Sequence, residues 1–346
     1  MTSLDEVKKY YGQTITSQDD LKTTACCTAE KPPQHILDAL NNLHPKIHDT
    51  YYGCGLIAPD ELEDLRILDL GSGTGHDVYL LAQLTGPKGY VLGVDMTDEQ
   101  LEIAREYEKF HQEKFGYSER NTEFFKGYIE NLDMIDTDSI DLVVSNCVVN
   151  LSNNKEAVLN EIYRVLKPGG EFYFSDVYSS RRIPKKLQED SVLWGECLSG
   201  ALYWNDFLHL AQKVGFNDPR LVKDKQIAPK NAELEATLGD IKFYSVTYRL
   251  FKIEDLEYDC EDYGQIVTYN GTITNHSEEW QLDNHHTFRT NEKMRVCMNT
   301  YLILGRSRFE KHFTFESPEP LTHLGIFPDC GKGIPFESSG SVSKCC

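Results

Sequence analysis

The stretch ILDLGSGTGHD, residues 67–77, decides the fold. Its apolar run is followed by glycines at 71, 73 and 75, and a second apolar run, YVLGVDM, reaches Asp95 twenty residues beyond Gly75. Gly71 and Gly73 let the chain turn tightly and approach a ligand closely, and Asp95 can accept hydrogen bonds from both hydroxyls of a ribose. The G-x-G-x-G order, unlike G-x-G-x-x-G, favours S-adenosylmethionine, which has no phosphate, over a dinucleotide.

Strand and helix patterns alternate from residue 67 to about 178. Strands are expected from residue 67 and over 90–96, 122–127, 140–146 and 171–178, with helices between them that stop at GPKG (86–89) and KPGG (167–170). The segment Thr97 to Gln100 has the form of a helix-capping box. Short connections and apolar strands predict an α/β, Rossmann-like fold, a parallel sheet covered by helices on both faces. Ligands of such sheets lie at the carboxyl ends of the strands.

The pattern divides the chain into five parts. An N-terminal segment and lid (1–66) precedes the nucleotide-binding core (67–180), and a helical insertion with the end of the sheet (181–240) follows it. Helices are expected over 184–216, with Gly215 as a C-cap. Strand-like runs, including KFYSVTYRLF (242–251), predict a smaller C-terminal β-containing domain (241–330), and 331–346 is expected to be a flexible tail.

Composition and net charge limit the kinds of molecule that the protein is expected to bind. The chain has 346 residues, ten cysteines and a formal net charge of -20, which argues against binding the phosphate backbone of nucleic acids. No secretory signal and no apolar run of roughly 18 residues is visible, so we expect no membrane segment. A cytoplasmic location is expected, where cysteines stay reduced.

Three cysteines fall near the expected ligand crevice. Cys147 follows the strand at 140–146, Cys197 lies in the WGEC segment after the fifth strand, and Cys54 lies in YYGCG just before the core. Sequence spacing alone does not show that they converge. Each one alone is also consistent with a small buried hydrophobic residue.

The chain resembles the arsenite methyltransferases that use S-adenosylmethionine. The matching segments are VKKYYGQ (7–13), YYGCGL (51–56), ILDLGSGTGHD (67–77), GVDMT (93–97), GYIENL (127–132), VVSNCVVNL (143–151), RVLKPGG (164–170), YFSDVY (173–178) and VLWGECLSGALYW (192–204). The resemblance implies that Cys54, Cys147 and Cys197 bind trivalent arsenic, with 181–240 as the arsenic-binding insertion. It also implies redox turnover by an N-terminal cysteine, for which the adjacent Cys26 and Cys27 are both candidates.

The chemistry agrees with this implication. Trivalent arsenic is soft and thiophilic, and thiolates are the side chains that select soft ions. Bound to three sulfurs, arsenic keeps a lone pair that can attack the electrophilic methyl group, so no general base is needed. Positioning at roughly 3–3.5 Å and exclusion of water would then supply the catalysis.

The remaining candidates concern the cofactor and turnover. Asp69, Gly71, Gly73 and Gly75 would line the methionine end, Asp95 the ribose, and Asn146 the methionyl group. Ile129 and Glu130 match the family's adenine segment, and Met96 could pack on adenine or simply fill the core. Asp176 and Glu196 could border the arsenic site or be structural. Disulfides formed in turnover would need thioredoxin or glutathione as reductant.

The expected function is therefore methylation of arsenite and methylarsenite in detoxification. Two alternatives stay open: methylation of an organic small molecule with the cysteines merely structural, and a non-catalytic soft-metal binder. A hydroxyl or carbon substrate would require a base, for which the sequence offers no clear candidate. An intact glycine loop with Asp95 disfavours the binder.

Overall fold

The computed structural model describes residues 32–48, 56–190, 193, 197–228, 232–328 and 330. The predictions for Cys26, Cys27, Cys54, Glu196 and the tail therefore lie outside the described residues. The chain divides into two compact units. Unit 1 comprises the chain up to Ile253 together with Gln281–Thr287, and unit 2 comprises Glu254–Trp280 and the chain from Phe288 onward.

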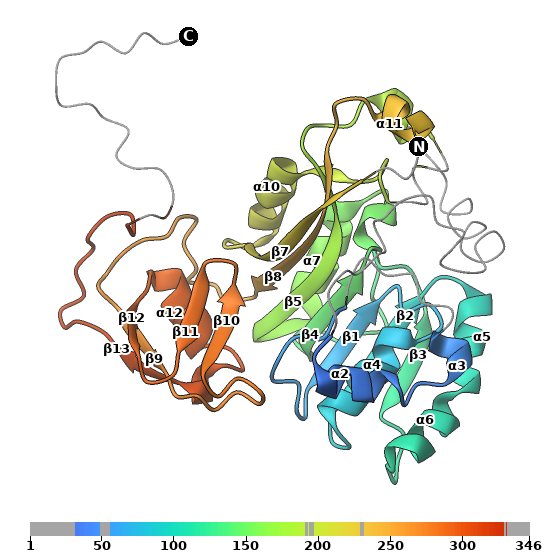
Figure 1. Cartoon of the computed structure of the whole chain (residues 1–346), viewed down its shortest axis with the longest axis horizontal. Coiled ribbons are helices and arrows are strands. Elements are labelled where there is room, and N and C mark those ends of the chain that lie inside the picture. Colours follow the sequence, from blue (N-terminus) through green and yellow to red (C-terminus); the bar gives the residue numbers. More distant parts are fainter. Residues whose placement is uncertain are drawn as a thin grey trace. The chain divides into compact units, whose positions relative to one another are not determined.

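Unit 1 is built on one mixed sheet (Figure 1). Its strands are β1 (Arg66–Leu70), β2 (Tyr90–Asp95), β3 (Thr122–Lys126), β4 (Ile140–Asn146), β5 (Leu166–Ser179), β7 (Arg220–Ile227) and β8 (Phe243–Phe251), in the order β3-β2-β1-β4-β5-β8-β7. The five strands β1 to β5 run parallel, and the short β6 (Leu202–Tyr203) pairs with β5. The carboxyl ends of β1, β2, β4 and β5 therefore meet at one edge, as predicted.

Helices cover both faces of this sheet, which confirms the predicted layers. One apolar cluster joins the sheet to α4 (His76–Thr85) and α5 (Asp98–Glu106), and a second joins it to α7 (Lys155–Val165) and α10 (Trp204–Val214). The shorter helices are α2 (Gln34–Leu40), α3 (Pro45–His48), α6 (Glu108–Phe115), α8 (Lys185–Gln188) and α11 (Ala232–Leu238). Among the described residues, no helix is long and apolar enough to cross a bilayer.

The structure corrects three expectations about unit 1. KFYSVTYRLF forms β8, which pairs antiparallel with β5 and β7, so unit 1 continues to Ile253 rather than ending at 240. KPGG lies within β5 because Gly169 and Gly170 pair with Lys252 instead of forming a separate turn. Thr97 is the N-cap of α5, but its side chain makes no capping hydrogen bond. Gly215 does end α10, as predicted.

Unit 2 contains a small three-stranded sheet, β12-β9-β13, with β9 (Ile266–Tyr269) between β12 (Lys293–Arg295) and β13 (Phe313–Glu316). The helix α12 (Met298–Gly305) also belongs to unit 2. The hairpin of β10 (Glu279–Asp283) and β11 (His286–Arg289) is shared, because Gln281–Thr287 belongs to unit 1. Aromatic side chains form its core, with Trp280 in ring contact with Phe288, Phe309 and Phe313. The predicted β-containing C-terminal part thus exists, with its boundary at residue 254.

Candidate active site

The glycine loop between β1 and α4 is held against the end of β2. The amides of Gly71 and Ser72 donate to the carbonyl of Val94 at 2.8 and 3.1 Å. Gly71 and Gly73 have φ values of 72° and 51°, which favour glycine. A Cβ added at Gly73 would meet only the Gln100 side chain, at 3.8 Å. This part of the loop therefore leaves its backbone accessible to a ligand.

Asp95 is oriented by this loop. Its carboxylate accepts hydrogen bonds from the amides of Gly73 and Thr97, at 2.9 and 2.8 Å. Burial raises the pKa of Asp95, and these hydrogen bonds oppose the rise. Because each carboxylate oxygen accepts more than one hydrogen bond, Asp95 can still receive ribose hydroxyls. A ribose-binding role for Asp95 stays a prediction.

Two further carboxylates lie beside Asp95. Burial raises the pKa of Asp69 well above its usual value, and the charges of Asp77 and Asp95 raise it further. Asp77, in the first turn of α4, accepts a hydrogen bond from Asn146 at 3.0 Å and is paired with His76 at 2.8 Å. A cationic ligand would relieve this repulsion. The positively charged S-adenosylmethionine fits the cluster on that ground.

Asp77 was missed by the sequence analysis although it ends the quoted motif. The signal available was an acid in the first turn of a helix directly after the glycine loop. Because Asn146 donates to it, the end of β4 is tied to the same cluster. The predicted contact of Asn146 with the methionyl group stays a prediction.

The predicted adenine-side residues lie near the same strand ends. Ile129 is buried in the core, and Met96 is partly exposed just after β2. Glu130 accepts a hydrogen bond from the Ser152 hydroxyl, which joins this segment to the turn that follows β4. Nothing in these contacts identifies a ligand, so an adenine-binding role for these residues stays a prediction.

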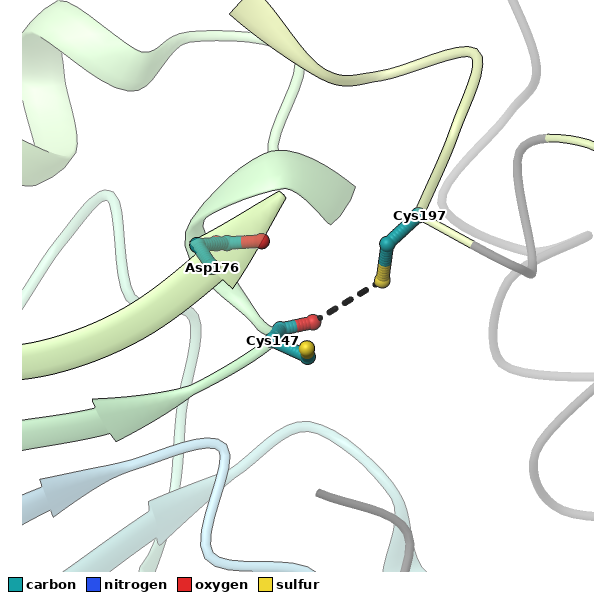
Figure 2. Close-up of side chains that lie close together, drawn as sticks. All are labelled: Cys147, Asp176 and Cys197. Carbon is teal, nitrogen blue, oxygen red and sulfur yellow. Dashed lines mark hydrogen bonds between the residues drawn. The ribbon is translucent and has the colours of Figure 1, made fainter. Parts of the chain in front are cut away.

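Cys147, Asp176 and Cys197 form a buried group (Figure 2). One ligand atom from each, the two sulfurs and a carboxylate oxygen, lie within 4.8 Å of one another. Their exposed fractions are 4%, 1% and 3%, so bulk water has little access. The Cys197 thiol donates to the carbonyl of Cys147 at 3.1 Å. Two of the three predicted arsenic ligands thus converge, and Cys54 lies outside the described residues.

The backbone at both cysteines is unusual. Cys147 and Cys197 have φ values of 58° and 60°, in the left-handed region that non-glycine residues rarely adopt. The amide of Cys147 donates to the carbonyl of Ser175 on β5 at 2.8 Å, which holds the turn after β4 in place. Such a conformation persists only where surrounding structure maintains it, and it often marks functional sites.

Asp176 is held by the short 3-10 helix η3 (Val149–Leu151) and by its own strand. Its carboxylate accepts hydrogen bonds from the Asn150 amide at 3.0 Å, the Asn150 side chain at 2.7 Å and the Val177 amide at 2.8 Å. Burial raises the pKa of Asp176 to about 6, against the opposing effect of these bonds and of Lys155. The carboxylate therefore has a defined orientation beside the sulfurs.

Lys155, the first residue of α7, is a second site residue that the sequence analysis missed. Its ammonium donates to the carbonyls of Ser152 and Asn150 at 2.8 and 3.2 Å. Burial lowers the pKa of Lys155 to about 8, while the neighbouring charges of Asp176, Cys197 and Glu130 favour the ammonium. A lone lysine at a helix start carries no sequence signal for such a role.

The oxidation states of the described cysteines differ. Cys197, Cys260, Cys297 and Cys330 are not in disulfides, whereas Cys147 is disulfide-bonded. Its sulfur can ligate arsenic only after reduction of that bond. Because Cys147 is oxidised and Cys197 is not, the site that they share is sensitive to redox conditions.

The cofactor loop and the sulfur group are adjacent. Val148, the residue after Cys147, packs closely on Gly71. A Cβ atom added at Gly71 would lie 2.4 Å from the Cγ2 atom of Val148. Together with the parallel strand order, this arrangement defines the protein as an S-adenosylmethionine-dependent methyltransferase of Rossmann-like fold. Residues 61–215 match the family model described as a methyltransferase domain.

The particular family follows from the rest of the chain. Residues 263–328 match the arsenite methyltransferase C-terminal domain. The chain is 49% identical to an arsenite methyltransferase of Aquipseudomonas alcaligenes over 99% of both chains. It is 48% identical to the arsenite methyltransferase of Homo sapiens, over 89% of this chain and 82% of that one. The chain therefore belongs to the arsenite methyltransferase family.

Comparison with a solved structure supports the same family. The arsenic(III) S-adenosylmethionine methyltransferase of Chlamydomonas reinhardtii superposes with a TM-score of 0.83 at 47% identity, over 86% of this chain and all of that one. Because that identity is high, the likeness extends beyond a shared fold. The resemblance identified from the cysteine motifs is confirmed.

Proposed function

We propose that this protein transfers methyl groups from S-adenosylmethionine to trivalent arsenic, as arsenite and methylarsenite, held by Cys147 and Cys197 with Cys54 as the third sulfur. One observation carries the proposal: two buried cysteines converge, and Val148, the residue after Cys147, packs against Gly71 of the glycine loop. Soft sulfur donors select a thiophilic metalloid over oxygen-liganded ions. The methylated products would serve detoxification.

In this proposal, the residues at the glycine loop and the two cysteines have separate roles. When bound, S-adenosylmethionine supplies an electrophilic methyl group on a sulfonium centre. The carboxyl groups of Asp69, Asp77 and Asp95 gather at the glycine loop, and a bound cation would favour their charged forms. Cys147 and Cys197 hold the substrate in a buried position, so the reaction is shielded from water. Catalysis by positioning requires no proton acceptor on this chain.

Turnover in this proposal depends on thiol reduction. Cys147 is disulfide-bonded in the structure, so a reductant such as thioredoxin or glutathione must act before arsenic binds. Cys26 or Cys27 would take part in that exchange. The cytoplasm keeps thiols reduced and is the compartment that this chemistry favours.

The experiment is a direct assay. Purified, reduced protein is incubated with arsenite, S-adenosylmethionine labelled in the methyl group and a thiol reductant, and arsenicals are separated by chromatography with arsenic-specific mass detection. We expect labelled methyl- and dimethylarsenicals. Protein that binds S-adenosylmethionine yet leaves arsenite unmethylated would refute the proposal. Labelled transfer to an added panel of hydroxylated small molecules instead would favour an organic substrate.

A further inference from the structure

Asp176 contributes the only oxygen donor to the group that gathers with the two sulfurs in the described part of the chain. Its carboxylate oxygen, the Cys147 sulfur and the Cys197 sulfur lie within 4.8 Å of one another, and all three side chains are buried. An oxygen is a poor direct ligand for a soft centre, so this carboxylate calls for a different explanation.

The position of Asp176 follows from the sheet. β4 and β5 run parallel with Asn146 beside Ser175, so the next residues, Cys147 and Asp176, end up at the same edge. Three N–H groups, from Asn150 and Val177, fix the carboxylate. These hydrogen bonds favour a single orientation of the carboxylate. A fixed carboxylate in a site with little water is suited to receive a hydrogen bond from a bound hydroxyl.

The substrates differ in the hydroxyls they keep. Arsenite exchanges two hydroxyls for two thiols: As(OH)₃ + 2 RSH gives (RS)₂As–OH + 2 H₂O, in which two S–As bonds form, two As–O bonds break, and the thiol protons leave in the water. One As–OH remains. Methylarsenite reacts likewise to (RS)₂As–CH₃ and keeps none. Neither exchange is a redox step.

We infer that Asp176 accepts a hydrogen bond from the remaining hydroxyl of arsenite while Cys147 and Cys197 hold the arsenic. The inference rests on the proposed function and deepens it, because it makes Asp176 a residue that distinguishes inorganic arsenite from methylarsenite. The contact ends when a third thiol displaces that hydroxyl as water. Methylarsenite, with a methyl group in place of the hydroxyl, gains nothing from the carboxylate.

The test measures kcat/KM for arsenite and for methylarsenite in the fully reduced protein. Asp176→Asn should lower the arsenite-to-methylarsenite ratio by about tenfold, the loss expected for one hydrogen bond to a charged group. An asparagine amide would also face the Asn150 amide donor. Asp176→Ser, which adds no such donor clash, is therefore the second variant and should lower the ratio similarly.

Asn150→Ala is the matched control. It removes the side-chain donor to Asp176 and Val177 but keeps the carboxylate, so a merely structural effect would appear there as well. We expect both substrates to be affected alike in this variant. An unchanged ratio in both Asp176 variants, or an equal fall in Asn150→Ala, overturns the role of Asp176 alone. Wild-type protein that methylates neither arsenical overturns the proposed function itself.

Discussion

Gly71 has no room for a side chain. Its φ is 72°, and an added Cβ would lie 2.4 Å from the Val148 side chain. We predict that Gly71→Ala lowers the free energy of unfolding by about 2–5 kcal/mol, the sum of left-handed strain and overpacking. It should also weaken S-adenosylmethionine binding, because the loop must shift.

Gly116→Ala is the control for this prediction. Gly116 has a φ of 75°, but nothing lies within 4 Å of an added Cβ. Only the backbone cost, about 1–2 kcal/mol, is expected. Urea denaturation and calorimetric titration with S-adenosylmethionine measure the two effects. Equal stability of the two variants would contradict the close contact between the loop and Val148.

In the proposed function, substrate binding depends on the sulfur atoms of Cys147 and Cys197. We predict that Cys147→Ser or Cys197→Ser lowers arsenite methylation by more than about 100-fold, since losing a residue that only orients a metal ligand already costs roughly 10–100-fold in affinity. S-adenosylmethionine affinity should be retained. Product analysis by arsenic-specific mass detection gives the rates.

Cys260→Ser is the matched control for this pair, because Cys260 is not in a disulfide and belongs to unit 2. It should methylate arsenite at nearly the wild-type rate. Near-normal turnover of either site variant would remove that cysteine from the mechanism.

At the scale of the element, β8 is held to β5 by a buried ion pair. Arg249 donates to Glu171 at 2.7 Å and to the carbonyl of Leu282 at 2.6 Å, with both charged side chains almost fully buried. We predict that Arg249→Met lowers the free energy of unfolding by about 3–5 kcal/mol, because it removes the cation that pairs with the buried Glu171 carboxylate. Urea denaturation measures the loss.

Two comparisons test the cause. Replacing both residues, Glu171→Leu with Arg249→Met, should recover most of the stability because no charge then remains buried. Lys213→Met breaks the exposed pair of Lys213 with Glu156 and should cost less than about 1 kcal/mol. A double variant as unstable as Arg249→Met would show that packing, and not the buried charge, explains the loss.

At the scale of the whole molecule, His111 makes the stability of unit 1 dependent on pH. Its Nε2 atom accepts from the His44 amide at 3.1 Å, and Nδ1 lies 2.8 Å from the Tyr107 carbonyl. Only a neutral ring satisfies both contacts. Burial lowers the pKa of His111 from 6.5 to about 4, against the opposing effect of the Tyr107 hydrogen bond.

The direction of this pH dependence follows from which state of the chain binds the proton. Between pH 6.5 and about 4 the unfolded chain binds a proton at His111 that the folded chain does not. Stability should therefore be full above this window and fall as pH decreases through it, with a contribution approaching about 1.4 kcal/mol per pH unit. His111→Gln removes the titration. The difference between wild-type and variant unfolding free energies, measured from pH 7 to 4, should follow this course; a flat difference would contradict it.

How much of the fold can be predicted from the sequence depends on how far apart in the chain the interacting residues lie. The parallel strands β1 to β5 are local patterns of apolar residues, and they were predicted within a few residues apart from the earlier start of β5. β8 was assigned to the wrong unit because its pairing with β5 joins residues 64 to 80 positions apart in the chain. No periodicity within KFYSVTYRLF reveals which sheet it joins.

The candidate site, like the fold, could be predicted from the sequence only in part. Cys147 and Asp176 could be placed at one sheet edge from the ends of two predicted strands, although the role of Asp176 was left open. Cys197 comes from a segment after β5, and only the fold brings its sulfur to Cys147. Lys155 was overlooked because its importance arises from burial among Asp176, Cys197 and Glu130.

By itself, the sequence determined the cofactor class, the parallel core and the family, because glycine spacing, an acid at a strand end and cysteine motifs are short-range chemical signals. Only the tertiary structure decided that Cys147, Asp176 and Cys197 share one buried site, that Asp77 joins the acids of the glycine loop and that β8 completes the first unit. The physical reason is that burial and charge interaction depend on which distant residues meet, and chain order does not specify that.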